Sequence, residues 1–182
     1  KPQTPNPKPL VAISRYRYVL STCLFVINIM EARKVIRKID INNKEDYDKV
    51  MALRKLICAD FVGNEEEFFS YDKVSDIYLM ELANGQPLGT VTITPEALGF
   101  RFSSIAVSDK YQNSGLASYM IKNLFAAHLP KLKPGQFFYT FSKLHLVDFY
   151  KSFGGETLGN PFIRWGRPHQ IVKSTFQDYV RL

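Results

Sequence analysis

Residues 112–117, with the sequence QNSGLA, combine residue types that can bind an anion. The alternating run FRFSSIAV before them predicts a strand, and apolar spacing at Leu116, Met120 and Leu124 predicts a helix after it. The first N–H groups of a helix have no partner inside it and lie at the positive end of its dipole, so phosphate oxygens can accept from them. Gly115 has no side chain to keep a phosphate away from the backbone. This order of elements therefore predicts an anion site.

The two best-known phosphate-binding patterns are missing from the chain. It has neither the dinucleotide pattern G-x-G-x-x-G nor a Walker sequence ending in Gly-Lys-Ser/Thr. A Rossmann oxidoreductase and a P-loop nucleoside triphosphatase are therefore disfavoured. A plain helix start with one glycine in its first turn would have a similar sequence, so the loop alone leaves both interpretations open.

Alternating strand and helix patterns surround this loop and predict a mixed sheet flanked by helices in one domain. Strands are predicted at 35–39, 75–82, 87–94, 100–107, 136–141 and 165–176, and helices from Asp40 to Gly63 and at 65–73, 114–129 and 144–153. Asn42 or Asn43 could cap the first helix. The dipeptide Asn84-Gly85 predicts a hairpin between the second and third strands.

The composition is that of a folded domain. The chain has 182 residues, of which 46% are hydrophobic and 14% aromatic, and this excludes wholesale disorder. No apolar run approaches the roughly 20 residues needed to span a bilayer, which excludes a polytopic membrane protein. Cys23 and Cys58 form no C-x-x-C pair and the three histidines are scattered, so no metal site is predicted. We expect a reducing, cytoplasmic location.

Basic charge is concentrated at the beginning of the chain. The net charge is +7, and residues 1–29 contribute +4 of it, because they hold four basic residues and no acidic one. The remaining +3 gives little reason to expect a nucleic-acid partner. Residues 1–29, which begin with the proline-rich KPQTPNPKPL, are predicted to be an extension before a domain at 30–182. A poorly ordered tail, an added strand or helix, and a targeting segment all remain open.

Three segments resemble motifs of the GNAT superfamily of N-acetyltransferases. Gln112, Gly115 and Ala117 match its Gln/Arg-x-x-Gly-x-Gly/Ala signature. The run DFYKSFGGE resembles its Phe-Tyr-x-x-x-Gly-Phe segment, with Gly155 where Phe is usual, and GNPFIRWGRPHQI resembles the Gly-x-Pro-Phe…Gly-x-Pro-His ending of a bacterial subgroup of small acetyltransferases. The resemblance implies the acyl-CoA N-acyltransferase fold, which is α+β with a mixed, mostly antiparallel central sheet flanked by helices.

The resemblance also implies acetyl-CoA as the donor, a primary amine as the acceptor, and direct attack within a ternary complex. A bulge at the end of the central strand, near residues 105–107, would free an N–H for the thioester carbonyl. Tyr150, a core aromatic in the alternative interpretation, would protonate the leaving thiolate, since tyrosines are ordinarily protonated at neutral pH. The implied coenzyme-binding residues are Ile105, Ala106, Val107, Gln112, Asn113, Ser114, Gly115, Leu116, Ala117 and Ser118.

The base that takes a proton from the amine is less clearly defined. Glu81, Glu96, His145 and His169 are candidates, and a chain of water molecules is an alternative. His169 lies in the Gly-x-Pro-His ending, so we predict it as a catalytic residue together with Tyr150. His128 is expected only to place a favourable charge at the end of a helix.

The acceptor itself is predicted only as a class. Acidic residues stand beside aromatic ones at 65–71, where they could attract a cationic amine or form a solvated helix start. Lys110, Lys143 and Lys151 could reach the coenzyme phosphates or lie on plain surface. We expect a small-molecule amine, no nucleic-acid or membrane partner, no metal, and a monomer or homodimer. The alternatives are a protein N-terminal or lysine acetyltransferase and a non-catalytic coenzyme A sensor.

Overall fold

The computed structural model describes residues 33–57 and 65–174. Contacts divide the chain into two units, with the boundary between Arg33 and Lys34, and the helices and strands named below belong to the second unit. The predicted extension at 1–29 lies outside the described residues, so its boundary stays a prediction. Among the described residues, no helix has both the length and the apolar character to cross a bilayer.

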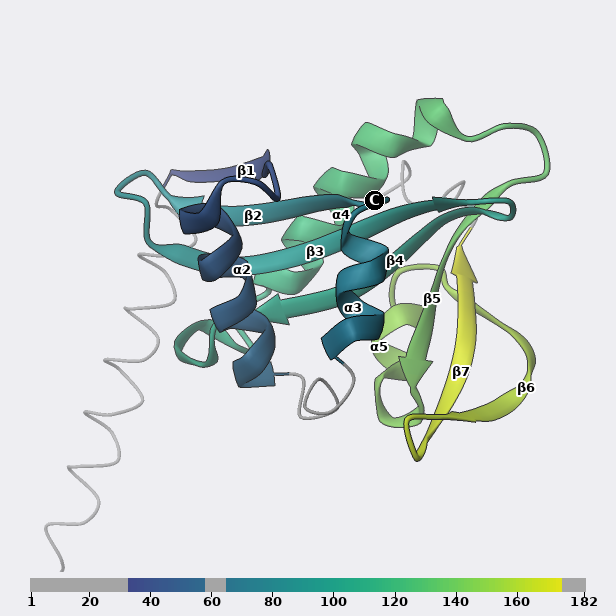
Figure 1. The fold of residues 1–182 in the computed structure, drawn as a ribbon. Coiled ribbons are helices and arrows are strands. Elements are labelled where there is room, and N and C mark those ends of the chain that lie inside the picture. Colours follow the sequence, from purple (N-terminus) through teal and green to yellow (C-terminus); the bar gives the residue numbers. More distant parts are fainter. Residues whose placement is uncertain (1–32, 58–64, 175–182) are drawn as a thin grey trace, which may run out of the picture. The chain divides into compact units, whose positions relative to one another are not determined.

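The second unit contains one seven-stranded sheet with helices on both of its faces (Figure 1). The strands are β1 (Lys34–Lys38), β2 (Asp76–Leu82), β3 (Pro87–Glu96), β4 (Gly99–Val107), β5 (Phe137–Lys143), β6 (Glu156–Arg164) and β7 (Arg167–Ser174). The α-helices are α2 (Lys44–Ile57), α3 (Glu65–Asp72), α4 (Leu116–His128) and α5 (Val147–Lys151). The strand order is β1-β2-β3-β4-β5-β7-β6, and only β4 and β5 pair in parallel. This confirms the predicted α+β class with a mixed, mostly antiparallel sheet.

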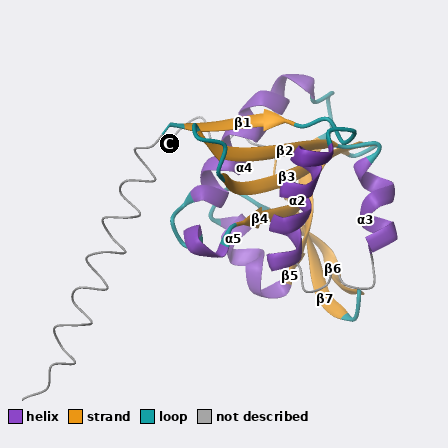
Figure 2. Ribbon diagram, turned by 60° about the vertical axis from the view of Figure 1, so that its left-hand side comes forward, coloured by secondary structure: helices purple, strands orange, loops and turns teal. Residues whose placement is uncertain are grey.

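Helices α2 and α4 pack against the middle of the sheet from opposite sides (Figure 2). On the α2 side, Val50 and Leu53 belong to a buried cluster with Ile77 and Leu79 of β2. Helix α2 begins where the sequence predicts, because the Asn43 side chain accepts a hydrogen bond from the Asp46 N–H at 3.3 Å.

The α4 side of the sheet is held by aromatic side chains. The ring of Phe125 on α4 stacks on Phe138 of β5 with their centroids 4.4 Å apart, and it meets Phe102 of β4 edge to face at 4.5 Å. These contacts fix α4, and with it the loop that precedes α4, relative to β4 and β5.

Strand β4 is irregular in its carboxyl-terminal half, where it bulges against β3 and separates from β5. Opposite β3, Thr90 pairs with Ala106 but Thr92 pairs with Ser103, so β4 contains one extra residue at Ser104–Ile105. Ser104 has φ +48°, in the left-handed region that non-glycine residues rarely adopt. On the other side, β4 pairs with β5 only from Gly99 to Arg101, and the two strands then diverge (Figure 1).

Most predicted element ends lie within four residues of the observed ones, and the predicted helix stop at Gly63 lies outside the described residues. The Asn84-Gly85 hairpin is confirmed, with Gly85 at φ +81° between β2 and β3. Strand β6 is absent from the sequence prediction, because it is an exposed edge strand that contains Gly159 and Pro161 and shows no buried alternation. The predicted strand start at Trp165 is wrong, because Trp165 and Gly166 form the positive-φ turn between β6 and β7.

Candidate active site

The first of two neighbouring cavities lies beside the loop before α4, and we call it the loop cavity. Its volume is about 510 Å³. It is lined by Ile105, Val107, Tyr111, Gln112, Asn113, Gly115, Leu116, Ala117, Ser118, Lys143, His145, Leu146, Phe149 and Tyr150. The cavity therefore lies between the end of β4, the start of α4 and the segment that leads into α5.

Backbone conformation shapes the loop cavity. Asn113 and Gly115 have φ of +59° and +80°, and a side chain built on Gly115 would meet no atom within 4 Å. The prediction that the helix starts at Ser114 is wrong, because Gly115 is its left-handed cap and α4 begins at Leu116. The first three N–H groups of α4, at Leu116, Ala117 and Ser118, have no acceptor within the helix and belong to residues that line the cavity.

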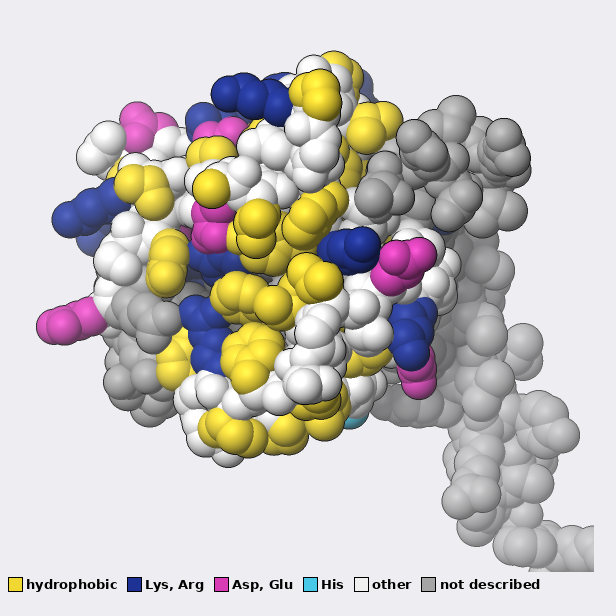
Figure 3. Space-filling view, turned by 90° about the vertical axis from the view of Figure 1, so that its right-hand side faces the viewer, with side chains coloured by type: hydrophobic (Ala, Val, Ile, Leu, Met, Phe, Trp, Pro, Cys, Tyr) yellow, Lys and Arg dark blue, Asp and Glu magenta, His cyan; other side chains and the backbone are white. Residues whose placement is uncertain are grey.

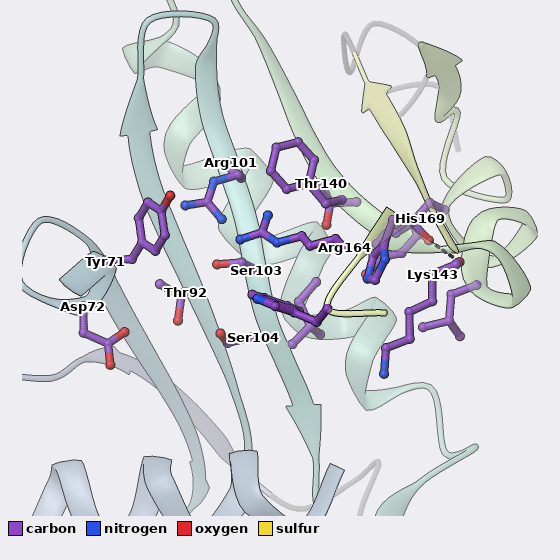
Figure 4. Close-up of a pocket in the computed structure, with 16 residues that line it drawn as sticks. Tyr71, Asp72, Thr92, Arg101, Ser103, Ser104, Thr140, Lys143, Arg164 and His169 are labelled. Atoms are coloured by element: carbon purple, nitrogen blue, oxygen red, sulfur yellow. Dashed lines mark hydrogen bonds between the residues drawn. The ribbon is translucent and has the colours of Figure 1, made fainter. Parts of the chain in front are cut away.

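The second cavity lies on the α3 side of β4 and β5, and we call it the arginine cavity (Figure 4). Its volume is about 170 Å³. It is lined by Tyr71, Asp72, Thr92, Arg101, Ser103, Ser104, Ile105, Thr140, Phe141, Ser142, Lys143, Leu146, Tyr150, Arg164, Trp165 and His169. Five strands and the end of α3 contribute to it, together with the β6–β7 turn and the segment from β5 to α5.

Two arginines mark one end of the arginine cavity. The guanidinium of Arg101 is buried and lies over the rings of Tyr71, at 4.5 Å, and Phe141, at 5.6 Å. Its Nε donates to Glu96 Oε1 at 2.6 Å. Arg164 of β6 lies over the same Phe141 ring at 4.9 Å, and also over Trp165 at 4.2 Å. The two cations therefore share an aromatic partner at the wall of one cavity.

The carboxylate of Asp72 at the cavity wall is hydrogen-bonded by side chains that do not line the cavity. Arg54 of α2 is fully buried and donates to both Asp72 oxygens, at 2.6 and 2.9 Å. The Tyr47 hydroxyl donates to Asp72 at 2.8 Å, and Arg54 also donates to the Thr92 hydroxyl at 2.7 Å. Burial and the neighbouring Asp72 raise the pKa of Tyr47. This bonded cluster joins α2, α3 and β3 behind the cavity.

His169 reaches the arginine cavity from β7. It lies opposite Lys143 of β5 and Phe162 of β6 in the sheet, and only 3% of its surface is exposed. Its Nδ1 lies 2.9 Å from the Arg167 carbonyl oxygen, which can only accept a hydrogen bond. The proton of the neutral ring is therefore assigned to Nδ1, and Nε2 is the atom that can accept a proton.

Tyr150 lies where the two cavities meet. It lines both of them, together with Ile105, Lys143 and Leu146. The backbone after Tyr150 turns tightly, because the Gly155 N–H donates to the Tyr150 carbonyl at 3.1 Å. A Cβ on Gly155 would come within 2.6 Å of that carbonyl oxygen, so a side chain at this position would push the turn away. The departure from the usual Phe therefore has a packing cause.

Unusual backbone conformations occur at both cavities. Among the described residues, the non-glycine residues with positive φ are Ser104, Asn113 and Trp165. Asn113 lines the loop cavity, whereas Ser104 and Trp165 line the arginine cavity. Such conformations cost free energy, on the order of 1–3 kcal/mol each, and they concentrate at functional sites.

Eight of the ten residues predicted to bind the coenzyme line the loop cavity, and two do not. Ala106 is in the buried cluster on the α2 side of the sheet, because the bulge at Ser104 and Ile105 turns it away. Ser114 is buried, and its hydroxyl donates to the Tyr111 carbonyl instead of facing the cavity.

Two of the four base candidates lie away from both cavities. Glu81 is bound by Arg37 at 2.9 Å and by Lys49 at 3.3 Å on the β1–α2 side. Glu96 is bound by Arg101 and Tyr139. Burial would raise the pKa of Glu96, but these two hydrogen bonds, together with the positive charges of Arg101 and Arg164, lower that pKa. Both carboxylates are therefore structural partners of other side chains.

The three histidines differ in their surroundings. His145 lines the loop cavity and His169 the arginine cavity. The expectation of a charged helix end at His128 is wrong, because burial lowers the pKa of His128. Its Nδ1 lies 2.9 Å from the Leu124 carbonyl oxygen and its Nε2 lies 3.3 Å from the Tyr78 hydroxyl. Among the described residues, no group of three or more His, Cys, Asp or Glu side chains is placed to hold a metal ion.

The charged side chains that the structure describes at the arginine cavity include Asp72, Arg101, Lys143 and Arg164. Of the acidic residues at 65–67, the structure describes the side chain of Glu66, which is exposed. Lys143 lines both cavities, whereas Lys110 and Lys151 line neither. Sequence reasoning missed Arg101 and Arg164. A charged residue at an inward position of the alternating run FRFSSIAV was the signal that could have revealed Arg101.

Several solved structures with a similar fold are described as N-acyltransferases or N-acetyltransferases. An acyl-CoA N-acyltransferase from Pseudomonas aeruginosa matches with a TM-score of 0.62 and 15% identity, over 79% of this chain and 99% of that one. A GNAT family acetyltransferase from Elizabethkingia anophelis with acetyl-CoA bound gives 0.59 and 14%, over 78% and 97%. An aminoglycoside 6'-N-acetyltransferase complexed with coenzyme A gives 0.63 and 14%, over 78% and 97%.

Comparisons of the amino-acid sequence alone identify no related family or protein. No protein-family profile matches the chain, and no curated protein matches it. At 14–15% identity the likeness to solved structures establishes architecture and not activity. The chain therefore has the acyl-CoA N-acyltransferase fold, the architecture that the GNAT resemblance implied.

Proposed function

We propose that this protein is an N-acetyltransferase that moves an acetyl group from acetyl-CoA to a primary amine on a small molecule. The observation that carries the proposal is the meeting of two cavities of different character at Tyr150. One is bordered by helix-start amides, and the other by charged and aromatic side chains. Two structures of the same fold were solved with acetyl-CoA or coenzyme A, which agrees with this assignment.

The loop cavity fits the diphosphate part of acetyl-CoA. The backbone N–H groups at the start of the 13-residue helix α4 can donate to phosphate oxygens, and the open space at Gly115 lets a phosphate approach them. Residues 112–118 would hold the diphosphate, and Ile105 and Val107 would flank the remainder. Acetyl-CoA supplies the acetyl group as a thioester, which an amine can attack.

The residues between the cavities would handle charge and protons. Neither ladder pairs Ser104 or Ile105 of the bulge, so backbone amides there are placed to stabilise negative charge on a carbonyl oxygen. The transfer forms an N–C bond and breaks a C–S bond, so one proton leaves the amine and one reaches the sulfur. The Tyr150 hydroxyl would give the proton to the sulfur, and Nε2 of His169 would receive the proton from the amine.

The proposed reaction predicts a large effect at one atom. Tyr150→Phe should lower turnover about 100-fold, because the variant keeps the ring but loses the proton donor. Tyr119→Phe is the matched control, since Tyr119 lies on α4 and lines neither cavity. Thiol release from acetyl-CoA with a panel of primary amines measures turnover, and calorimetry measures coenzyme A binding, which the Tyr150 variant should retain.

The same measurements separate the alternatives. Coenzyme A binding without thiol release or acetylated product for any amine or peptide would favour the non-catalytic sensor. Transfer to peptide N-termini or lysines, but not to free small amines, would favour the protein acetyltransferase. Equal turnover in Tyr150→Phe and in the unchanged protein would remove Tyr150 from the reaction.

A further inference from the structure

We infer that the acceptor is a primary amine that also carries a carboxylate, which the arginine cavity binds at its Arg101 and Arg164 end. The inference rests on the proposed function, because it names the class of amine that the enzyme would acetylate. It differs from one of the two interpretations of the acidic residues at 65–67, in which they attract a cationic amine.

An unused donor on Arg101 is the first observation. The side chain is 4% exposed, and within the part of the chain that the structure describes its buried Nη2 has no hydrogen-bond partner. Glu96 binds Nε, on another edge of the guanidinium. A buried donor without a partner costs free energy, so its presence at a cavity wall calls for an acceptor that arrives with a ligand.

The charge of the cavity is the second observation. Arg101, Lys143 and Arg164 line it, and the carboxylate at its wall is Asp72, which Arg54 already binds through both oxygens. Glu96 offsets part of the Arg101 charge, yet cations remain in excess. Figure 3 shows Lys and Arg side chains interleaved with hydrophobic ones on the side of the molecule that faces right in Figure 1. A cavity with this excess of positive charge favours a ligand that carries an anionic group over a ligand that is purely cationic.

The orientation of the guanidinium groups favours a carboxylate. The faces of both arginines are covered by aromatic rings, Tyr71 and Phe141 for one and Phe141 and Trp165 for the other. The buried Nη2 of Arg101 is the donor left to bind a ligand, and a guanidinium edge matches the planar, two-oxygen geometry of a carboxylate. In Figure 4 the two side chains extend toward one another from β4 and β6.

The place of the arginines relative to Tyr150 sets the shape of the ligand. Arg101 and Ile105 are four residues apart on β4, which corresponds to at most roughly 13 Å of strand, because the bulge at Ser104–Ile105 shortens it. The carboxylate would lie at the arginine end and the amine at the Tyr150 end. Both α-amino acids and amino acids with a distant amine therefore belong in a test.

Each acid is tested beside the amine that lacks only its carboxylate. The pairs are L-leucine with 3-methylbutan-1-amine and 6-aminohexanoate with pentan-1-amine. Trp165 is the sole tryptophan of the chain and lines the cavity, so its fluorescence reports binding independently of turnover. Thiol release from acetyl-CoA gives kcat/KM for each compound, and coenzyme A calorimetry is run in parallel.

Arginine variants locate the effect. Arg101→Gln and Arg164→Gln should each lower the ratio of kcat/KM for the preferred acid to kcat/KM for its paired amine about 10- to 100-fold. Arg167→Gln is the matched control, because Arg167 pairs with Arg164 across the same hairpin but does not line the cavity. If Arg101→Gln fails to fold, the measurement on Arg164→Gln tests the inference, because Arg164 is only half-buried.

We expect at least one acid to exceed its paired amine by tenfold or more in both binding and turnover. Equal or better use of the paired amines, with coenzyme A bound and thiol released, would overturn the carboxylate and leave the acetyltransferase intact. A preference for 2-aminoethanesulfonate or 2-aminoethyl phosphate over every carboxylate would also overturn it. Absence of both coenzyme A binding and thiol release would overturn the proposed function, and this inference with it.

Discussion

The loop cavity and the arginine cavity meet at Tyr150 but are built in different ways. Seven of the residues around the loop cavity come from one short segment, 111–118, and its wall depends on backbone conformation. The arginine cavity takes side chains from five strands and α3, and its character comes from charges and rings. Ligand affinity at the loop cavity should therefore change little when a side chain is replaced, but fall when the backbone conformation changes. Ligand affinity at the arginine cavity should fall when a lining side chain is replaced.

The largest expected effect is at the ion pair behind the arginine cavity. Arg54→Met should lower the free energy of unfolding by about 3–5 kcal/mol, because it leaves the buried carboxylate of Asp72 without its cation. Urea denaturation measures the change.

The double variant Arg54→Met with Asp72→Asn should recover part of that stability, since it removes the unpaired charge. Coenzyme A affinity of the folded protein should stay within about threefold of the original. If Arg54→Met alone lowers the free energy of unfolding by less than about 1 kcal/mol, the wall of the arginine cavity does not depend on the Arg54–Asp72 pair.

The next effect concerns the chain path at the loop cavity. Gly115→Val should weaken coenzyme A binding about tenfold or more, because a side chain at φ +80° would distort the turn and occupy the space beside the α4 amides. Calorimetric titration with coenzyme A measures the affinity.

Gly85→Val is the matched control for backbone strain. Gly85 has φ +81° and equally open surroundings, but it lies in the β2–β3 turn and lines neither cavity. Both variants should lose similar stability, about 1–3 kcal/mol, and only Gly115→Val should lose affinity. Equal affinities in the two variants would contradict a backbone site at the loop.

The smallest expected effect is that of removing a side chain, and not a backbone conformation, at the loop cavity. Gln112→Ala should change coenzyme A affinity by less than about threefold, because the Gln112 amide makes only a long hydrogen bond, 3.5 Å, to the Val107 carbonyl. The same calorimetric titration applies. A loss as large as that of Gly115→Val would mean that side chains, and not the backbone, determine binding at this loop.

The same difference explains what could be predicted from the sequence. The loop before α4 is contiguous, so Gln112, Gly115 and Ala117 revealed it together with the strand and helix on either side. Hydrophobic periodicity likewise predicted six of the seven strands and the helices that pack on them. The exposed edge strand β6 carries no such pattern, and it was missed.

The arginine cavity could not be assembled from the sequence. Arg101 and Arg164 are 63 positions apart, and only the strand order β4-β5-β7-β6 brings them to the same Phe141 ring. Trp165 points there because it occupies a left-handed turn position that propensity assigns to other residue types. Pairing of distant strands is decided by packing across the sheet, whereas the bulge was implied by the resemblance near residues 105–107 and lies at Ser104–Ile105.

The short parallel seam between β4 and β5 has a consequence for how the sheet holds together. Backbone pairing joins β1–β4 to β5–β7 over only three residues on each strand. A molecule that fills the space where the strands diverge would contact both groups of strands at once and fasten them. By mass action, a ligand at a hundred times its Kd adds about 2.7 kcal/mol to the stability of the folded state. Substrate would then serve as part of the scaffold, and amide hydrogen exchange in β5 and β7 would slow when it is bound.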